Sequence, residues 1–425
     1  MKVGIIGAGF SGLSSAHKLA KNGAEVTVFE MDEKPGGLAA GFERTVWKWS
    51  LEKHYHHWFY SDMSARNLAK EIGQEVVIGP TKTSTFLDGD IFQLDSPLSL
   101  LRFGRISFWQ RMRTGIVLAY LKLTPFWKPL EGVTAKEFLE KYMGEESWRV
   151  LWQPLFQKKF SAYADSIPAS WFWARIKKRS IKLCYPAGGF LSFAKKLEKE
   201  IKKLNGKFLY GTKVESVEKD GEKLFVKTEK EKYNFDSVIC TLPSFLFLKV
   251  VKGLPESYIQ NLSSLKGLGA VNLVLSLRRK FLSDGTYWLS IGELKFPFLA
   301  VVEHTNFMMS SNYGGENIVY IGKYLSNNHE YFQKDANSLL AEYMPYLKKI
   351  NPSFSKDWII GSWVFKTPFA QPIVPLNYSK IMPSMETPIA NLFLANIEQV
   401  YPWDRGTNYA IELGEKAAEM VLKSG

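Results

Sequence analysis

The sequence predicts an α/β protein in which two domains are interleaved along the chain. Patterns of strand, glycine turn and helix occur in three separated blocks, within residues 1–30, 185–245 and 391–422. Between them, residues 97–179 are mostly helical, whereas residues 246–383 contain several strand-like runs. The chain of 425 residues is long enough for two or three domains. Its 46% hydrophobic residues, with 13 Trp, 19 Tyr and 29 Phe, can build a large core and line a pocket with rings.

The first block has the pattern of a βαβ unit that binds a dinucleotide. A buried-strand run, Val3–Ile6, leads directly into Gly7-Ala-Gly9-Phe10-Ser11-Gly12 and a helix pattern, and the next strand ends at Glu30. In such a unit Gly7 makes the tight turn, Gly9 lets backbone N–H groups approach a pyrophosphate, and Gly12 allows close helix–strand packing. The Glu30 carboxylate can accept hydrogen bonds from ribose hydroxyls, so we expect a Rossmann-like domain to begin here.

Turn and capping signals predict the remaining elements. Asp88-Gly89 lies between two strand-like runs and predicts a hairpin, and Thr134 and Glu137 form a capping box within the helical part. The glycine pair Gly188-Gly189 precedes the helix of the second block. Strands are then expected at 213–218, 224–228 and 236–243, a helix at 335–350, and a last strand and helix at 391–395 and about 407–422.

Composition and charge limit the classes of protein and partner. The two cysteines, Cys184 and Cys240, exclude a disulfide framework and a cysteine-based zinc site, and they fit a reducing compartment. No run is long and apolar enough to span a bilayer, so we expect a cytoplasmic protein. The net charge of +13 suits an anionic partner, but it is spread along the chain and no nucleic-acid-binding module is recognised. We therefore expect no nucleic acid.

Five motifs occur in order along nearly the whole chain. They are the acid and glycine pair in Glu30-Met-Asp-Glu-Lys-Pro-Gly36-Gly37, the proline and glycine pair in Tyr185–Phe190, and the strands at 213–217, 236–243 and 392–395. In this order they resemble the FAD-dependent amine oxidase, protoporphyrinogen oxidase and phytoene desaturase superfamily, which has a glutathione-reductase-like FAD-binding fold. The resemblance implies FAD as the cofactor.

The resemblance also implies a division of the chain and a set of cofactor-binding residues. Segments 1–80, 185–245 and 384–425 would form the FAD-binding domain, and a hairpin and helical part (81–184) and a sheet (246–383) would form an α+β substrate domain. The residues implied to bind FAD are Gly7, Gly9, Phe10, Ser11, Gly12, Glu30, Gly36, Gly37, Leu38, Val214, Asn396, Glu398, Gly406, Thr407 and Asn408.

Three departures from the superfamily pattern concern the cofactor. Leu38 stands where many members have a basic residue after the glycine pair. The usual Leu-Ala-Gly-Asp/Glu is replaced, so either Glu398 takes the acidic role through a one-residue shift, or Asn396 and the backbone replace it. Because the last cysteine is Cys240, the C-terminal cysteine linkage of some amine oxidases is excluded, and FAD should be noncovalent.

Half of the six histidines lie within four residues, at His54, His56 and His57. Three interpretations stay open: a metal site, histidines that only make structural hydrogen bonds, and a catalytic role beside the flavin. We favour the last, with His54 and His57 as the catalytic residues and no metal, because a turn would bring them together and imidazole titrates near working pH. The spacing of His54 and His57 also resembles the histidine segment of UDP-galactopyranose mutases.

The substrate is expected to be a small molecule, lipophilic or phosphorylated. The segment 101–129 mixes cations with rings and can lie on an anionic membrane, which would add peripheral binding at the cytoplasmic membrane face; a plain solvated helical face is the alternative. The cations are Arg102, Arg105, Arg111 and Arg113, and the rings are Phe103, Phe108 and Trp109. A pocket could draw on Trp152, Lys158, Lys159, Trp171, Trp173 and Arg175, although core packing is the default for such rings. Polar groups of the expected sheet, in 303–306 and 363–371, could also face the flavin.

The function expected from these observations is an FAD-dependent oxidoreductase that takes a hydride from an organic substrate onto flavin N5. A flavin-dependent sugar-nucleotide mutase, which makes no net redox change, is the alternative. A noncatalytic scaffold stabilised by FAD is a third reading.

Overall fold

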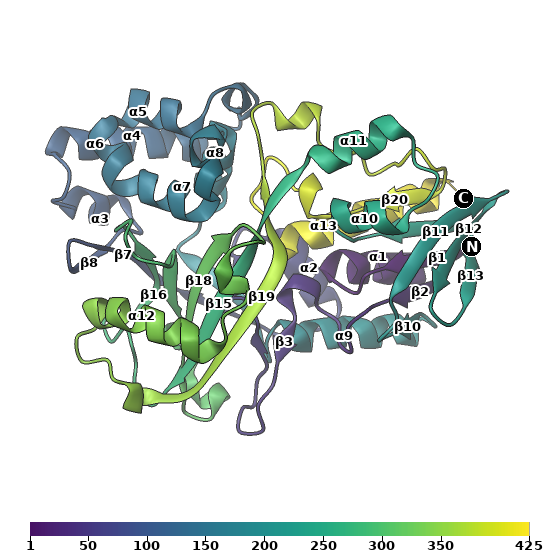
Figure 1. The fold of residues 1–425 in the computed structure, drawn as a ribbon, viewed down its shortest axis with the longest axis horizontal. Coiled ribbons are helices and arrows are strands. Elements are labelled where there is room, and N and C mark those ends of the chain that lie inside the picture. Colours follow the sequence, from purple (N-terminus) through teal and green to yellow (C-terminus); the bar gives the residue numbers. More distant parts are fainter. Residues whose placement is uncertain (425) are drawn as a thin grey trace.

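A five-stranded parallel sheet is built from strands that lie far apart in the sequence (Figure 1). The computed structural model describes residues 1–424, and its strand order in this sheet is β10 (Lys207–Leu209), β2 (Glu25–Phe29), β1 (Lys2–Ile6), β14 (Ser237–Cys240) and β20 (Leu392–Leu394). Ile6 is paired with Phe29 on one side and Cys240 on the other. The carboxyl ends of the strands therefore share one edge, where ligands of such sheets bind.

Helices cover one face of this sheet. α1 (Phe10–Lys21) packs against α9 (Phe190–Lys203) and α13 (Thr407–Ser424), and α2 (Met63–Glu71) packs on α13. The approach of α1 to α13 is close, because a Cβ on Gly414 would lie 2.1 Å from the Ser11 carbonyl oxygen. The other face is covered by α10 (Ser244–Val250), α11 (Glu256–Ser264) and a small sheet of β11 (Val214–Asp220), β12 (Lys223–Thr228) and β13 (Lys232–Phe235).

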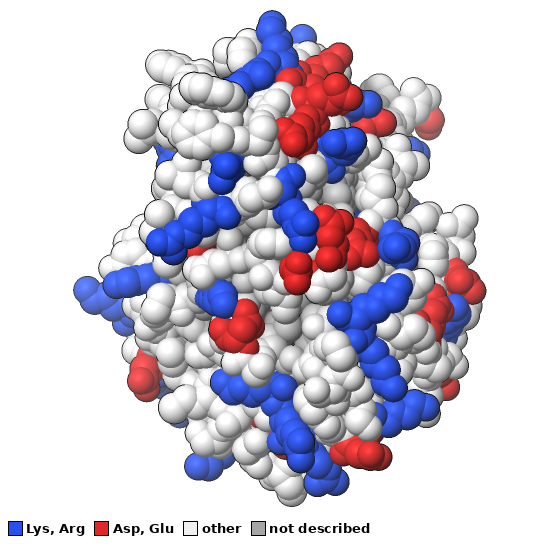
Figure 2. All heavy atoms as spheres, turned by 90° about the vertical axis from the view of Figure 1, so that its left-hand side faces the viewer, with Lys and Arg blue, Asp and Glu red and all other residues white. Residues whose placement is uncertain are grey.

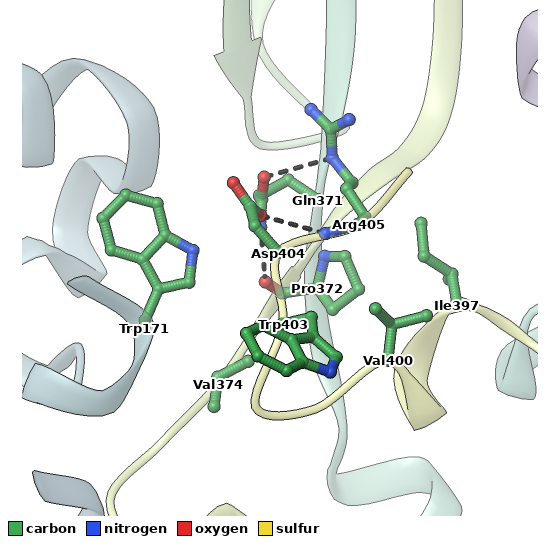
Figure 3. Close-up of a pocket in the computed structure, with 9 residues that line it drawn as sticks. All are labelled: Trp171, Gln371, Pro372, Val374, Ile397, Val400, Trp403, Asp404 and Arg405. Atoms are coloured by element: carbon green, nitrogen blue, oxygen red, sulfur yellow. Dashed lines mark hydrogen bonds between the residues drawn. The ribbon is translucent and has the colours of Figure 1, made fainter. Parts of the chain in front are cut away.

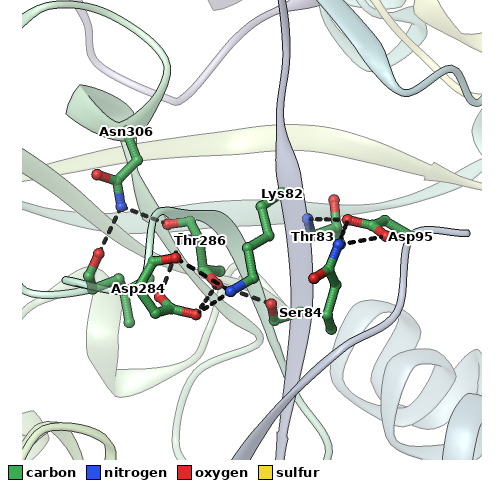
Figure 4. A network of polar contacts seen from close by, with 9 residues as sticks. Lys82, Thr83, Ser84, Asp95, Asp284, Thr286 and Asn306 are labelled. Carbon is green, nitrogen blue, oxygen red and sulfur yellow. Dashed lines mark hydrogen bonds and ion pairs between the residues drawn. The ribbon is translucent and has the colours of Figure 1, made fainter. Parts of the chain in front are cut away.

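A seven-stranded mixed sheet forms the centre of the second domain. Its order is β19 (Ile359–Ile373), β15 (Lys266–Leu277), β18 (Asn317–Leu325), β17 (Ala300–Glu303), β16 (Thr286–Ile291), β7 (Lys82–Leu87) and β8 (Asp90–Gln93). On β15, Val271 and Leu273 pack toward α12 (Ala336–Ile350), so Asn272 and Val274 face the opposite side. Polar contacts join β7 to β16: the Lys82 ammonium binds Asp284, and the hydroxyls of Ser84 and Thr286 lie 2.9 Å apart (Figure 4).

A helical segment adjoins this sheet, drawn in blue in Figure 1. It comprises α3 (Pro97–Arg102), α4 (Phe108–Leu123), α5 (Ala135–Met143), α6 (Glu145–Ser147), α7 (Gln153–Phe160) and α8 (Ala169–Lys178). Its core contains Leu139, Phe156 and Trp171. The expected capping box at Thr134 is present, with both reciprocal bonds to Glu137.

Two small sheets connect the domains. β4 (Leu51–Glu52) pairs with β3 (Gly41–Phe42), and β9 (Lys182–Pro186) pairs with both β5 (Trp58–Phe59) and β6 (Val76–Pro80). The histidine cluster lies in the loop 53–57 that joins β4 to β5. This loop is therefore held at both ends by short strands.

The expected α/β fold class, with a parallel sheet drawing on three blocks of chain, is confirmed. The expected domain limits stay a prediction. Within residues 1–424, no helix has both the length and the apolar composition needed to cross a bilayer. Figure 2 shows Lys and Arg side chains spread between Asp and Glu side chains over one whole face, so the positive charge there does not gather in a single basic groove.

Candidate functional site

Two glycine loops meet at the carboxyl edge of the five-stranded sheet. Gly7 has a φ of +103°, and a Cβ on Gly12 would lie 1.9 Å from the Gly7 carbonyl oxygen, so both positions require glycine. The Gly36 N–H donates to the Ala8 carbonyl at 2.9 Å, and a Cβ on Gly37 would lie 3.0 Å from the Gly9 Cα. Without side chains, the two loops present bare backbone at the start of α1, which suits a pyrophosphate.

Glu30 lies at the end of β2 and holds the first glycine loop. Its carboxylate accepts the Ala8 N–H at 2.7 Å and the Asp32 N–H at 2.9 Å, and burial raises its pKa. The side chains of Phe10 and Ser11 are used in packing: Phe10 stacks on Phe193, and the Ser11 hydroxyl donates to the Ala395 carbonyl at 3.0 Å. Only the backbone of these two residues remains for a phosphate.

The C-terminal segment places two polar side chains against the loop after β14. The Asn396 amide donates to the Leu242 carbonyl at 3.1 Å, and the Glu398 carboxylate accepts the Ser244 N–H at 3.1 Å. Burial raises the pKa of Glu398 to about 7, and among the described residues its Oε2 has no hydrogen-bond partner. Asn396 and Glu398 thus both contact the loop after β14, and which of them takes the acidic role stays a prediction.

The start of α13 is hydrogen-bonded to β5, which directly follows the histidine loop, and to α2. The Trp58 indole N–H donates to the Thr407 hydroxyl at 2.6 Å, and the side-chain Oδ1 of Asn408 accepts the Ala65 N–H at 3.0 Å. The side chains of Thr407 and Asn408 are therefore occupied, and the backbone from Gly406 onward is the part that can face a ligand. Val214 is the first residue of β11 and lies near the end of β2, because the N–H of Thr212, two residues earlier, donates to the Glu30 carbonyl. Leu38, directly after the glycine pair, is exposed.

The histidine loop lies against the face of the seven-stranded sheet that is opposite α12. The Asn272 amide donates to His54 Nδ1 at 2.7 Å, and His57 Nδ1 lies 3.1 Å from the Tyr287 hydroxyl. His54 and His57 therefore both point to strands of this sheet. His56 instead bonds the His54 carbonyl through Nδ1 at 2.6 Å.

The histidines do not titrate near working pH. Burial lowers the pKa of His54 to about 3, of His56 to about 4 and of His57 to about 3. The expectation of titration near neutrality was wrong, because the enclosed surroundings disfavour the imidazolium. Since His54 Nδ1 accepts from Asn272, its Nε2 carries the proton and can donate.

Glu52 fixes the position of this loop, and the sequence offered no signal for it. The side chain is fully buried, accepts the Tyr185 hydroxyl at 2.8 Å and the Phe190 N–H at 2.8 Å, and burial raises its pKa to about 7. The Glu52 carbonyl accepts the Tyr320 hydroxyl at 2.8 Å. One residue thus ties the loop to β9, α9 and the seven-stranded sheet.

A cluster of buried cations lies beside Tyr55, between the helical segment and the start of α13. It consists of Lys159, Arg175 and Arg405 around a single carboxylate, Asp404, which binds the Lys159 ammonium at 2.8 Å. The Arg405 guanidinium donates to Tyr324 and, at 3.1 Å, to Gln371, and Tyr324 shares a hydrogen bond with Tyr55. Burial raises the pKa of Tyr55, whereas the charges of Arg405 and Lys159 outweigh burial and lower that of Tyr324.

Two donors at this cluster lack an acceptor. Among the described residues, Trp171 Nε1 and Arg175 Nε have no hydrogen-bond partner, although both atoms are buried. The Trp171 nitrogen is directed toward Asp404 across a small cavity, shown in Figure 3. The cavity is lined by Trp171, Gln371, Pro372, Val374, Ile397, Val400, Trp403, Asp404 and Arg405. This cluster therefore has more cations than carboxylates, and two of its N–H donors are without an acceptor.

Several expected pocket residues have structural roles instead. Lys158 donates to the carbonyls of Phe296 and Phe298, and Trp173 donates to the Thr124 carbonyl. In the segment 303–306, Glu303 accepts backbone N–H groups, His304 bonds the Tyr313 hydroxyl, and Asn306 binds the Leu282 and Thr286 carbonyls. The polar groups of these side chains are thus bonded to neighbouring backbone or side-chain groups. Residues 1–424 bring together no three His, Cys, Asp or Glu side chains that could hold a metal ion.

A comparison against protein families agrees with this arrangement of the glycine loops, Glu30 and the C-terminal helix. The model of the flavin-containing amine oxidoreductases matches residues 10–422. The chain belongs to this family. The resemblance inferred from the motifs is thereby confirmed, and the family description implies a flavin cofactor.

Individual relatives are more distant. Hydroxysqualene dehydroxylase from Sinorhizobium fredii is 33% identical over 129 residues, a stretch that covers 29% of this chain and only 31% of that protein. The structure of reduced UDP-galactopyranose mutase has a TM-score of 0.80 at 15% identity, covering 100% of this chain and 96% of the other. Cyclohexylamine oxidase from Brevibacterium oxydans has a TM-score of 0.76 at 14% identity, covering 99% and 98%. At these identities the structures show a shared fold alone.

Proposed function

We propose that the chain holds FAD noncovalently along the carboxyl edge of the five-stranded sheet. The bare backbone of Gly9 and Gly37, the carboxylate of Glu30 as a ribose acceptor and the unpartnered Glu398 oxygen all fit this cofactor. Gly7, Gly12, Gly36 and the backbone of residues 406–408 would complete the site. Both cysteines are buried strand residues, which supports noncovalent binding. When bound, the isoalloxazine supplies N5 as the hydride acceptor for an organic substrate.

The histidine loop carries the proposal for the reaction. His54 and His57 are hydrogen-bonded to the seven-stranded sheet, and this supports a position of the loop between cofactor and substrate. The neutral His54 imidazole can donate from Nε2 to a carbonyl or hydroxyl and orient it. The rings of Tyr55 and Trp288 pack edge to face, with their centroids 4.9 Å apart, and would exclude water from the region beside His54 and His57.

The cation cluster supports a substrate with an anionic group. Lys159, Arg175 and Arg405 outnumber the one carboxylate, and burying unpaired charge is costly. A phosphate or diphosphate would supply both the missing charge and acceptors for Trp171 Nε1 and Arg175 Nε. The proposed substrate is therefore a phosphorylated organic molecule oxidised at a carbon held beside the histidine loop.

The same cluster fits the diphosphate of a sugar nucleotide, so a flavin-dependent sugar-nucleotide mutase is the second candidate. An anaerobic screen separates the two functions. FAD-loaded protein is mixed with prenyl phosphates, amines, porphyrinogens and UDP-sugars while the visible flavin band is recorded. Bleaching by a phosphorylated compound supports the oxidoreductase. Interconversion of a UDP-sugar only after prior chemical reduction of the flavin supports the mutase and overturns the leading proposal.

A further inference from the structure

Helix α4 presents an apolar stripe to the outside of the molecule. Its inner side packs into the helical segment through Thr114, Val117 and Leu121. A surface helix normally carries polar residues on its outer side. Here the outer side carries Trp109, Met112, Ile116, Tyr120 and Leu123, which follow the helical repeat and are all exposed. Trp109 and Leu123, near the two ends of α4, are 75% and 78% exposed, and the stripe runs for roughly 20 Å.

The apolar surface continues beyond α4. Phe126, just after the helix, is 73% exposed, and Leu98 and Leu101 of α3 and Phe108 are exposed as well. Contiguous exposed apolar surface of this kind marks an interaction site. Phe103 had been expected among these rings, but it is buried against Phe92 and belongs to the core.

The segment that carries this stripe is rich in cations and lacks acids, although Glu146 of the neighbouring α6 accepts the Ser107 N–H at the start of α4. Residues 96–130 contain Arg102, Arg105, Arg111, Arg113, Lys122 and Lys128 but no Asp or Glu. The end of α8 adds Lys177, Lys178 and Arg179, and it lies against α4, because the Lys122 ammonium binds the carbonyls of Ile176 and Lys177.

Most of these cations are not neutralised by carboxylates. Arg113 donates to the Lys141 carbonyl, and Arg111 donates to the Leu101 carbonyl, so their charges remain uncompensated. Arg105 is an exception, paired with Asp88 and Asp90, and Lys128 pairs with Glu131. The face therefore combines exposed rings and aliphatic side chains with net positive charge.

We propose that the α3–α4 face docks on an anionic lipid surface. The rings and aliphatic side chains of the stripe would enter the headgroup region, and Arg102 and Arg113 would contact lipid phosphates. A second copy of the chain fits less well, because pairing this face with itself would bring cations against cations. The inference does not depend on the reaction proposed above.

The test is cosedimentation of FAD-loaded protein with vesicles of phosphatidylcholine alone or of an equal mixture with phosphatidylglycerol. The wild type should bind the mixed vesicles at least about tenfold more tightly and should release in high salt. The stripe variant Ile116→Gln/Leu123→Gln should lose binding to the mixed vesicles, and so should Arg102→Gln/Arg113→Gln.

A matched control replaces two exposed apolar residues elsewhere. Leu294→Gln/Met309→Gln changes side chains that are 53% and 70% exposed outside the helical segment and should bind as the wild type does. Equal flavin content in all variants shows that they are folded. Equal binding to both vesicle types, or unchanged binding of the stripe variant, would overturn the proposal. So would a concentration-dependent dimer that the stripe variant abolishes, without vesicle binding, since it would assign the face to a second copy.

Discussion

Glu52→Gln tests how the histidine loop is held, and its effect on stability can be worked out from the structure. Burial raises the pKa of Glu52 to about 7 in the folded protein, against 4.5 for the exposed group. Because the folded state holds the proton more tightly, the stabilising contribution is present at low pH and is lost as the pH rises from about 4.5 through 7. A difference of about 2.5 pKa units corresponds to about 3 kcal/mol.

The assay is thermal unfolding of the wild type and the variant at pH 5 and pH 8 in saturating FAD. With an unfolding entropy of roughly 2 cal/mol/K per residue, 3 kcal/mol corresponds to about 3–4 °C in a chain of 425 residues. The fall in Tm from pH 5 to pH 8 should therefore be smaller by that amount in Glu52→Gln, because the amide does not titrate. An unchanged fall would refute the reasoning.

A second buried carboxyl provides the matched control. Glu303 also has a pKa raised by burial to about 7, but it accepts the N–H groups of Phe281 and Leu282, away from the histidine loop. Glu303→Gln should reduce the pH dependence of Tm similarly and leave the flavin spectrum unchanged. Glu52→Gln should also shift that spectrum, because Glu52 positions the loop 53–57.

Three further predictions concern the cofactor, the histidines and the cation cluster. Glu30→Arg should weaken FAD binding about 100-fold in a fluorescence titration, since it removes the two carboxylate oxygens that accept the Ala8 and Asp32 N–H groups. Glu25→Arg, at the exposed start of β2, should leave FAD binding unchanged. Undiminished binding in folded Glu30→Arg would remove Glu30 from the site. His54→Ala and His57→Ala should keep FAD but slow its reduction by about 10²–10⁴-fold, with His329→Ala as the control. Because the pKa of His54 and of His57 is about 3, the wild-type rate should show no inflection near pH 6.5 from either residue; normal spectra and rates in both variants would make the cluster structural. Arg175→Met should lower the affinity for pyrophosphate, measured from its perturbation of the flavin spectrum, about tenfold or more. Arg279→Met, just after β15 and exposed, should leave this affinity unchanged. Equal affinities in the wild type and Arg175→Met would show that the cluster does not bind the anion.

The sequence predicts the fold well because its signals are local. The glycine turn after Val3–Ile6, the capping box at Thr134 and the Asp88-Gly89 turn each determine a nearby element, and all three are present. The glycine loops are equally local. A Cβ at Gly12 would collide with the Gly7 carbonyl, so the motif states its own geometry.

The candidate site is less predictable because its contacts join distant segments. Asn272 meets His54 across 218 residues, and Lys159 meets Asp404 across 245. No sequence periodicity links such pairs. The position of Asp404 and Arg405 directly before Gly406 was a signal that could have identified them, since the helix start that follows was expected to approach the flavin.

Pattern also cannot separate a buried ring from an exposed one within a basic segment. Phe103 and Trp109 lie six residues apart in the same kind of sequence, yet Phe103 packs on Phe92 and Trp109 faces outward. The protonation of the histidines depended likewise on burial, which only the folded chain sets.

The central claim is that FAD bound at the two glycine loops is reduced by a substrate held at the histidine loop and the cation cluster. The most direct measurement is stopped-flow reduction of the purified protein under anaerobic conditions by the compound found in the screen, compared between wild type and His54→Ala/Arg175→Met. We expect releasable FAD in both proteins and fast bleaching of the flavin band in the wild type alone. Purified, folded protein without FAD, or equally fast bleaching in both proteins, would contradict it.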